Sequence, residues 1–404
     1  MATVQPFKAI RPTRDKAHLF ATRSYLTYSE ETLKEKLEHN PYTFLHIINP
    51  EYKKKNRKEG VEKFKLVKEK FEKFKKSGVL KKEEEKIFYL YRQQSRSHIF
   101  EGIIAACSVD DYINGRIKIH EHTITKREQM FTDYLNITCF NADPVLLSYK
   151  EENEINNLIK SVSRTEAEYN FTTTNKVKHQ LWLIDTQEDI NLICKAFENI
   201  EKVYISDGHH RAASSALLAK KRNAKKDANL NYFMSLLIAE NQLNIINFNR
   251  LLKNLNGLSV AKFINKIRNA YTVIESSSVE GKEKDEIGMY LDGKCYLLKA
   301  KEGSYKDDCV TRLDPDILFK NILSPILGIK DEKINKNISF IAGNTPIHKI
   351  KKRVDNGEFA VAFILKPISI EALKEVADKG KIMPPKSTYI EPKLRSGLTI
   401  YPID

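Results

Sequence analysis

Five consecutive residues near the middle of the chain combine a carboxylate, two imidazoles and a guanidinium: Asp207, Gly208, His209, His210 and Arg211. A guanidinium binds phosphate oxygens, and imidazoles donate hydrogen bonds or carry protons. A carboxylate belongs in an anion site when a cation accompanies the anion or when the carboxylate handles a proton. The combination predicts phosphoryl chemistry with a metal ion. The structural alternative is that Asp207 only caps a helix.

The residues around this motif predict a strand, a tight turn and a helix. Val203 to Ser206 alternate like a short buried strand, and Ala212 to Ala219 form a compact, apolar-rich helical pattern. A chain that turns through Gly208 into a helix leaves the first-turn backbone N–H groups unpaired. These groups and the helix dipole favour a bound anion, most readily a phosphate.

A second polar cluster precedes this motif. If the chain is extended there, His120 and His122 share one face and Glu121 takes the other. Two imidazoles at this spacing ligate zinc in proteins, although no third ligand lies nearby in the sequence. In a second interpretation, Glu121 or His120 is a general base, and Lys126 and Arg127 hold anions at the start of the next helix. The structural alternative is an ordinary polar strand exit.

The C-terminal residues 383–397 contain three prolines and three cationic residues. Proline stiffens an irregular loop, and Lys386, Ser387 and Thr388 present one charge, two hydroxyls and backbone N–H groups together. Such a loop is suited to clamp phosphate oxygens. It is not a Walker loop, because the Gly-rich run is absent. A plain extended tail is the structural alternative.

The composition sets broad limits on the class of protein. The 404 residues include 68 basic and 53 acidic side chains, for a formal net charge of +15, and the lysines are spread through most of the chain. This charge permits nucleic acid, acidic membranes or anionic small molecules as partners. Five scattered cysteines without Cys-x-x-Cys spacing, and no apolar run of about 18 residues, indicate a soluble cytoplasmic protein without a membrane partner.

Strand and helix patterns alternate along the chain and predict an α/β fold with mixed sheets. We expect an N-terminal lobe of residues 1–250 and a C-terminal α/β lobe of residues 251–404. Residues 51–77 predict an amphipathic helix, and we expect its apolar stripe to pack on the core. The alternative is that this basic helix binds a membrane or nucleic acid. Other expected helices cover residues 30–39, 152–163, 187–198, 260–270 and 314–323. The expected strands cover residues 87–92, 100–107, 179–184, 232–239, 338–343 and 359–365, and residues 143–149 are expected to form a turn and then a strand.

Three signatures together resemble one family from end to end. They are Asp207-Gly-His-His-Arg211, His120-Glu121-x-Thr123, and Met383-Pro-Pro-Lys-Ser-Thr388 with Glu391-Pro-Lys-Leu-Arg-Ser-Gly397. Pro6-Phe-Lys-Ala-Ile-Arg-Pro12, Leu90-Tyr-Arg92 and Leu313-Asp314 also agree, whereas the Lys-rich residues 51–77 are the least diagnostic part. On these motifs the chain resembles the pyrophosphate-dependent free serine kinase family, long catalogued as a conserved domain of unknown function.

The resemblance implies a ParB/sulfiredoxin-like core and a second, C-terminal α/β lobe whose loop closes the site. It also implies Mg²⁺-assisted transfer of a phosphoryl group from inorganic pyrophosphate to L-serine, giving O-phospho-L-serine for cysteine synthesis. The implied partners are small molecules, with no nucleic acid expected. ATP- or ADP-dependent serine kinases share this fold and form the first alternative. A non-enzymatic ParB-like nucleic-acid-binding protein is the second, although no helix-turn-helix is recognisable.

Within this resemblance, Asp207 is assigned to Mg²⁺ or to the serine hydroxyl as its base, and Glu121 with His120 is the alternative base. The candidates for the donor phosphates are His209, His210, Arg211, Lys386, Ser387 and Thr388, with His210 also a catalytic candidate. Lys393 and Arg395 are further candidates for the donor. The candidates for binding serine are Arg92, Thr123, Lys126 and Arg127.

Overall fold

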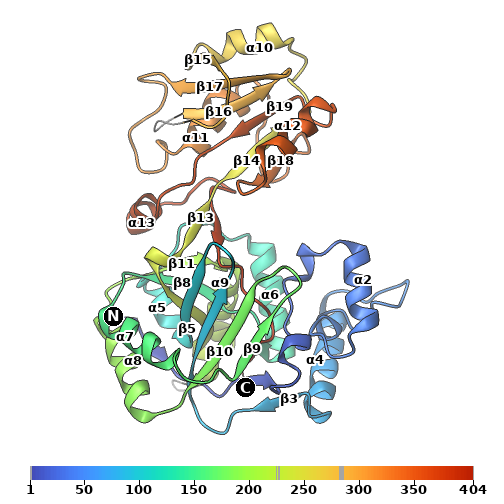
Figure 1. The fold of residues 1–404 in the computed structure, drawn as a ribbon, viewed down its shortest axis with the longest axis vertical. Helices are drawn as coiled ribbons and strands as arrows, with labels where there is room; N and C mark the ends of the chain where they lie inside the picture. The colour runs from blue at the N-terminus through green and yellow to red at the C-terminus, as the bar shows by residue number, and fades with distance from the viewer. Residues whose placement is uncertain (1, 224, 226–227, 282–285, 404) are drawn as a thin grey trace. The chain divides into compact units, whose positions relative to one another are not determined.

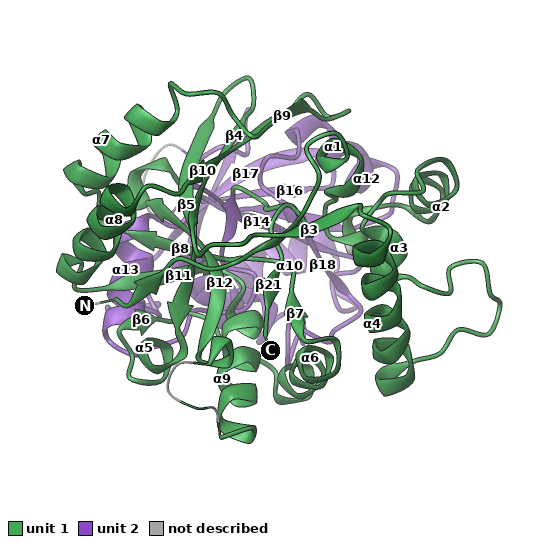
Figure 2. Cartoon of the chain, turned by 90° about the horizontal axis from the view of Figure 1, so that it is seen from below, with its two compact units in different colours: residues 1–243, 392–404 green, residues 244–391 purple. Residues whose placement is uncertain are grey.

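The computed structural model describes residues 2–223, 225, 228–281 and 286–403 (Figure 1). These residues fall into two compact units: unit 1, residues 1–243 and 392–404, and unit 2, residues 244–391 (Figure 2). The division differs from the expected lobes mainly at the C-terminus. Residues 392–403 belong to unit 1 because their backbone pairs there, with Ile400 against Ile10 and Tyr401 against Asn141.

A mixed sheet forms the centre of unit 1. Its strands lie in the order β6 (Ile117–Lys118), β11 (Val203–Asp207), β8 (Val145–Tyr149), β12 (Tyr232–Ala239), β5 (Ile99–Ser108), β4 (Phe88–Gln94), β10 (Lys178–Ile184) and β9 (Tyr169–Thr172), with β1 (Val4–Gln5) also beside β5. The pairs β11–β6 and β12–β8 are parallel, and the other pairs are antiparallel. The predicted class, α/β with mixed sheets, is confirmed.

Long runs of buried side chains identify the strands at the heart of this sheet. Every residue of β8 is buried, as are seven of the eight residues of β12. A strand buried on both faces requires packing on each side. Short ladders complete unit 1: β2 (Ile10–Pro12) with β3 (Leu80–Lys82), and β7 (Phe140–Asn141) with β21 (Tyr401–Pro402).

The helices of unit 1 include those predicted, most of them with shifted ends, and three helices of four or five residues that were not predicted. They are α1 (Ala17–Phe20), α2 (Glu30–His39), α3 (Leu45–Ile48), α4 (Gly60–Lys76), α5 (Val109–Ile113), α6 (Thr125–Thr138), α7 (Asn153–Val162), α8 (Gln187–Asn199) and α9 (His209–Lys221). Helix α4 begins at Gly60 rather than near residue 51, because the preceding Lys-rich stretch lacks apolar periodicity. Its Val67, Phe71 and Phe74 are buried in a core with Phe20 and Phe140, so the packing interpretation of the apolar stripe is confirmed.

Unit 2 contains an antiparallel sheet and its own core. The strand order is β15 (Tyr271–Ser276), β17 (Lys294–Ala300), β16 (Glu286–Leu291), β19 (Val361–Ile364), β14 (Phe248–Leu252) and β18 (Ile338–Ala342), and β13 (Asn244–Ile246) pairs separately with β20 (Tyr389–Glu391). The helices are α10 (Val260–Ile267), α11 (Asp314–Leu318), α12 (Ile347–Asp355) and α13 (Ile370–Asp378), and a π-helical turn (Phe319–Leu323) follows α11.

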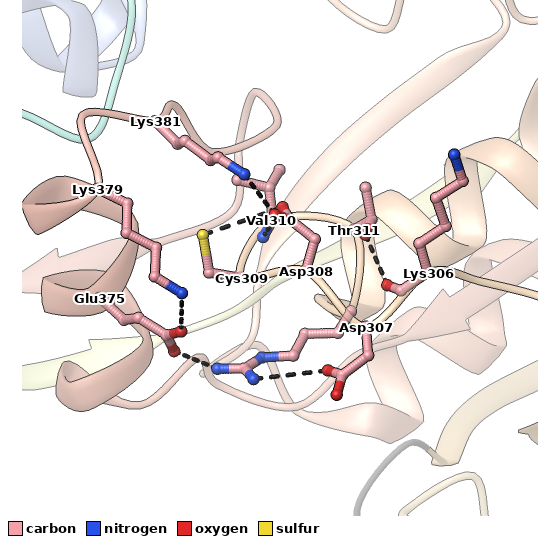
Figure 3. A network of polar contacts seen from close by, with 10 residues as sticks. Lys306, Asp307, Asp308, Cys309, Val310, Thr311, Glu375, Lys379 and Lys381 are labelled. Carbon is pink, nitrogen blue, oxygen red and sulfur yellow. Dashed lines mark hydrogen bonds and ion pairs between the residues drawn. The ribbon is translucent and has the colours of Figure 1, made fainter.

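A polar network in unit 2 attaches the end of α13 to the loop before α11 (Figure 3). Lys381 pairs with Asp308, and the Glu375 carboxylate accepts from both Arg312 and Lys379. The Lys381 ammonium lowers the pKa of Asp308 to about 2. These contacts fix the chain where it leaves α13 toward residues 383–388.

No helix in the described part of the chain is both long and apolar enough to cross a membrane.

The packing of the C-terminal residues on unit 1 gives a stability prediction. Gly397 has a φ of +87°, and a Cβ there would lie 2.9 Å from the ring of Phe20, which is fully buried. We expect Gly397→Ala to lower the free energy of unfolding by about 2 kcal/mol, from left-handed backbone strain and overpacking. The measurement is denaturant unfolding followed by fluorescence of Trp182, the one tryptophan of the chain, which lies in β10.

The matched control is Gly78→Ala. Gly78 has a φ of +75° but nothing within 4 Å of an added Cβ. This substitution should therefore lower the free energy of unfolding only through backbone strain, by about 1 kcal/mol. Equal losses in the two variants would show that residues 396–398 do not pack on Phe20.

Candidate active site

The turn between β11 and α9 has the strand–glycine–helix form that the sequence predicted. Gly208 is the N-cap of α9 and has a φ of +100°, a conformation that L side chains rarely adopt. A Cβ at Gly208 would lie 3.0 Å from the Arg211 guanidinium. Glycine is therefore required both for the turn and for the close approach of Arg211 to it.

Asp207, the last residue of β11, lies between two cations. Its Oδ2 is 3.3 Å from Nη2 of Arg211, and its Oδ1 is 3.5 Å from Nζ of Lys393. All three side chains are partly exposed, at 38% for Asp207, 25% for Arg211 and 41% for Lys393. The Arg211 guanidinium also donates through Nη1 to the backbone oxygen of Pro144, just before β8. A carboxylate and two solvent-accessible cations thus meet at the first turn of α9.

Two buried imidazoles lie beside this carboxylate. The rings of His120 and His209 are 4.5 Å apart and nearly perpendicular. Nε2 of His209 accepts from the backbone N–H of His120 at 3.4 Å, which places the ring proton of His209 on Nδ1. That Nδ1 is 3.7 Å from Oε2 of Glu121, a side chain that is 57% exposed. The Glu121 carboxylate thus lies near His209, beyond hydrogen-bond distance, and is accessible to solvent.

Burial keeps both imidazoles neutral. It lowers the pKa of His120 to about 4, although the nearby Asp207 charge acts in the opposite direction. Burial also lowers the pKa of His209, and the charges of neighbouring groups act in the same direction. At neutral pH these rings therefore add directed hydrogen-bonding groups rather than positive charge.

The residues between His120 and Thr125 belong to no strand, because β6 ends at Lys118. His120 is buried whereas His122 is exposed, so the two imidazoles lie in different surroundings. Among the residues that the structure describes, no group of three or more His, Cys, Asp or Glu side chains is arranged to hold a metal ion.

Thr123, Lys126 and Arg127 lie at the start of α6. Thr123 donates to the carboxylate of Glu128, whereas Lys126 and Arg127 are exposed and border a shallow hollow with Val61 of α4. Helix α6 is attached to α9, because Thr132 donates to the Ser214 backbone oxygen at 3.3 Å. The assignment of these three residues to serine stays a prediction.

Arg92 lies on β4, four strands from β11 in the order of the sheet, or roughly 19 Å at the usual strand spacing. Its guanidinium pairs with Glu101 and lies 5.0 Å from the centre of the Trp182 ring. These contacts give Arg92 a structural role within the sheet. Its assignment to serine stays a prediction.

The C-terminal residues place Lys393 and Arg395 in different surroundings. Lys393 reaches Asp207, whereas Arg395 is largely buried and donates from Nε to His179 at 3.1 Å and from Nη1 to the Ala21 backbone oxygen at 2.9 Å. Burial lowers the pKa of Arg395. Both residues are donor candidates in the sequence analysis. His179, the side chain that contacts Arg395, is not among the residues that the motifs identify.

Lys386, Ser387 and Thr388 belong to unit 2. Lys386 has a φ of +55° and its ammonium lies 5.1 Å from the centre of the Phe248 ring. Ser387 is buried and donates to the Pro384 backbone oxygen at 2.6 Å. These contacts give the loop a defined local conformation, and its assignment to the donor stays a prediction.

Residues 4–316 match a family model described as "Protein of unknown function (DUF1015)". The chain belongs to the DUF1015 family. Membership in a family of unknown function, expected from the three signatures, is thereby confirmed.

Solved structures resemble this DUF1015 protein only distantly. A variant of free serine kinase in complex with AMP has a TM-score of 0.39 and 15% identity, covering 73% of this chain and 92% of its own. Another variant of free serine kinase, in complex with ADP, has a TM-score of 0.39, 14% identity and the same coverage. SbnI with a C-terminal truncation, from Staphylococcus aureus, has a TM-score of 0.36 and 12% identity, covering 74% of this chain and 87% of its own. These values are too low to assign an activity, and no curated protein matches the chain.

The neutral state of His120 predicts a pH-dependent stability. The histidine pKa is about 6.5 in the unfolded chain, so between pH 6.5 and about 4 the unfolded state binds a proton that folded His120 does not. The free energy of unfolding should therefore fall as the pH drops through this window. We expect His120→Gln to make the decline near pH 5 less steep by about 1 kcal/mol per pH unit, measured by Trp182 fluorescence in denaturant.

The matched control is His122→Gln, two residues away with an exposed side chain, which should keep the wild-type slope. An unchanged slope in His120→Gln would mean that His120 is not held neutral.

Proposed function

We propose that this protein is a phosphotransferase that moves a phosphoryl group from inorganic pyrophosphate to the hydroxyl of free L-serine, forming O-phospho-L-serine and phosphate. The observation that carries the proposal is the meeting of Asp207, Arg211 and Lys393 at the first turn of α9. Phosphoryl transfer depends mainly on positioning and charge neutralisation, which this set of groups can supply. The sequence signatures support serine as the acceptor.

Pyrophosphate suits this site because it consists only of charged phosphate groups. It needs cations and N–H donors but no pocket for a base or a ribose. Arg211 offers a planar fork, Lys393 a point charge, and α9 its N-terminal N–H groups. Partly exposed ion pairs are worth only about 0–1 kcal/mol, so donor oxygens can displace the Asp207 carboxylate from both cations.

Displacement by the donor would free Asp207 for the acceptor or for Mg²⁺. Magnesium is usually held by one or two carboxylates together with substrate phosphates and water. Since the described residues form no metal cluster by themselves, Asp207 would supply one ligand and the donor oxygens others. When bound, the ion neutralises charge on the phosphates. The site therefore suits a Mg²⁺ ion that binds together with the anionic donor.

Asp207 and Glu121 are the two candidates for the general base. Asp207 adjoins the cations that would hold the donor, and the Glu121 carboxylate lies 3.7 Å from Nδ1 of His209. A base must lie within hydrogen-bonding reach of the serine hydroxyl, and either carboxylate is exposed enough to meet that requirement. One of these two carboxylates would accept the proton of the serine hydroxyl. His120 and His209 would stay neutral and would not take part in the proton transfer.

A donor comparison tests the proposed reaction. Purified protein with L-serine and Mg²⁺ should form phosphoserine with pyrophosphate, and the comparison arms contain ADP or ATP instead. Product is measured by ³¹P NMR and by mass spectrometry of the amino acid. The ADP arm is included because the distant structural relatives include free serine kinase in complex with ADP.

If phosphoserine forms only with a nucleotide, the donor is that nucleotide and not pyrophosphate. No product with any donor, together with salt-sensitive retention on DNA, would favour the nucleic-acid-binding alternative.

Replacement of the central carboxylate tests its place in the reaction. We expect Asp207→Asn to lower kcat by about 10³-fold, because an amide neither accepts the proton nor holds Mg²⁺. The control is Asp133→Asn, since Asp133 is 35% exposed and pairs with Lys221 at 3.5 Å, closely matching Asp207 in both respects. Near-normal turnover of Asp207→Asn would remove this carboxylate from the mechanism, and a matching loss in Glu121→Gln would make Glu121 the base.

A further inference from the structure

The C-terminal segment of unit 1 is fixed on both sides of Leu394. On the downstream side, Ser396 and Thr22 exchange two backbone hydrogen bonds, at 2.8 and 3.2 Å, and Gly397 donates to the Ala142 backbone oxygen at 3.0 Å. The Ser396 hydroxyl donates to the carboxylate of Asp143. The backbone three and four residues beyond Lys393 therefore has a defined path across unit 1.

His179 of β10 is the main side-chain contact of Arg395. Arginine is always protonated, so its Nε–H donates to Nε2 of His179, and the imidazole proton must lie on Nδ1. That Nδ1 is 2.8 Å from the hydroxyl of Tyr91, on the neighbouring strand β4. His179 is 3% exposed, and its burial, with the charges of Arg395 and Arg23, lowers its pKa to about 3. His179 thus accepts from Arg395 in one fixed tautomer.

Gln93 of β4 contacts the backbone of Lys393, the residue whose ammonium pairs with Asp207. Its Nε2 donates to the backbone oxygen of Lys393 at 3.3 Å, and it lies directly opposite His179 in the ladder. Alternation along β4 places Tyr91 and Gln93 on one face and Arg92 on the other. One face of β4 and β10 therefore supports the segment from Lys393 to Arg395.

We infer that His179 and Gln93 are positioning residues for Lys393, and that they act on phosphate binding from the far strands of the sheet. The inference rests on the proposed function, because it concerns the cation that would bind the donor. A lysine side chain has many rotamers, so its ammonium reaches Asp207 reproducibly only if its backbone is held. Gln93 holds the Lys393 carbonyl, and His179 holds Arg395 two residues later.

The test compares substitutions that remove each support. In His179→Phe the ring remains but its acceptor is lost, and Gln93→Leu removes the amide donor to Lys393. We expect each to raise the KM for pyrophosphate about tenfold with kcat changed far less and the KM for serine unchanged. Gln93→Leu keeps the test decisive if His179→Phe folds poorly.

A double-mutant cycle separates positioning from a general loss of structure. If His179 acts through Lys393, then His179→Phe should add little to the KM increase already caused by Lys393→Met. Phe171→Leu is the matched control: its ring centre lies 5.4 Å from that of His179, so the change loosens the packing of His179 but keeps the acceptor for Arg395 and the Gln93 amide. This variant should lose stability but keep the wild-type KM for pyrophosphate.

Each outcome decides the inference. An unchanged KM in both His179→Phe and Gln93→Leu, with an active wild type, overturns the positioning role and leaves the proposed function intact. If the wild type uses ADP instead, the same comparison is made on the KM for ADP. If it shows no turnover, the dissociation constant of pyrophosphate is compared by calorimetry. A wild type that neither turns over nor binds pyrophosphate overturns both proposals.

Discussion

The candidate site depends on one carboxylate shared by two cations that come from distant parts of the chain. Asp207 and Arg211 are brought together by the local turn at Gly208, whereas Lys393 arrives only because the C-terminal residues return to unit 1. The three charges are partly exposed, so water screens their attraction and the pairs are weak. Weak pairs suit a binding site, because an anionic substrate can take over the cations at little cost.

Two of the imidazoles, His120 and His209, add no positive charge to the site at neutral pH. His120 and His209 are desolvated, and the cost of burying a charge keeps them neutral beside Asp207. Positive charge at the site therefore comes from Arg211 and Lys393, while the neutral rings place hydrogen-bonding groups near Asp207 and Glu121. The assignment of these histidines to phosphate binding or catalysis stays a prediction.

The sequence predicted what local rules determine. A strand, a glycine and a helix follow from adjacent residues, and so does the apolar stripe of α4. Contacts between distant segments could not be predicted in the same way. Arg92 was predicted from its motif, whereas the contact of the neighbouring Gln93 with the Lys393 backbone oxygen, on the strand face that also carries His179, depends on strand pairing. Likewise, the return of residues 392–403 to unit 1 follows from strand pairing and packing that no local pattern contains.

The most direct measurement is a crystal structure of the protein with pyrophosphate and Mg²⁺. The account predicts phosphate oxygens within hydrogen-bonding distance of Arg211 and Lys393, with the Asp207 carboxylate released from both and turned toward the metal or the acceptor. Pyrophosphate bound away from all three residues, with both Asp207 ion pairs intact, would contradict it.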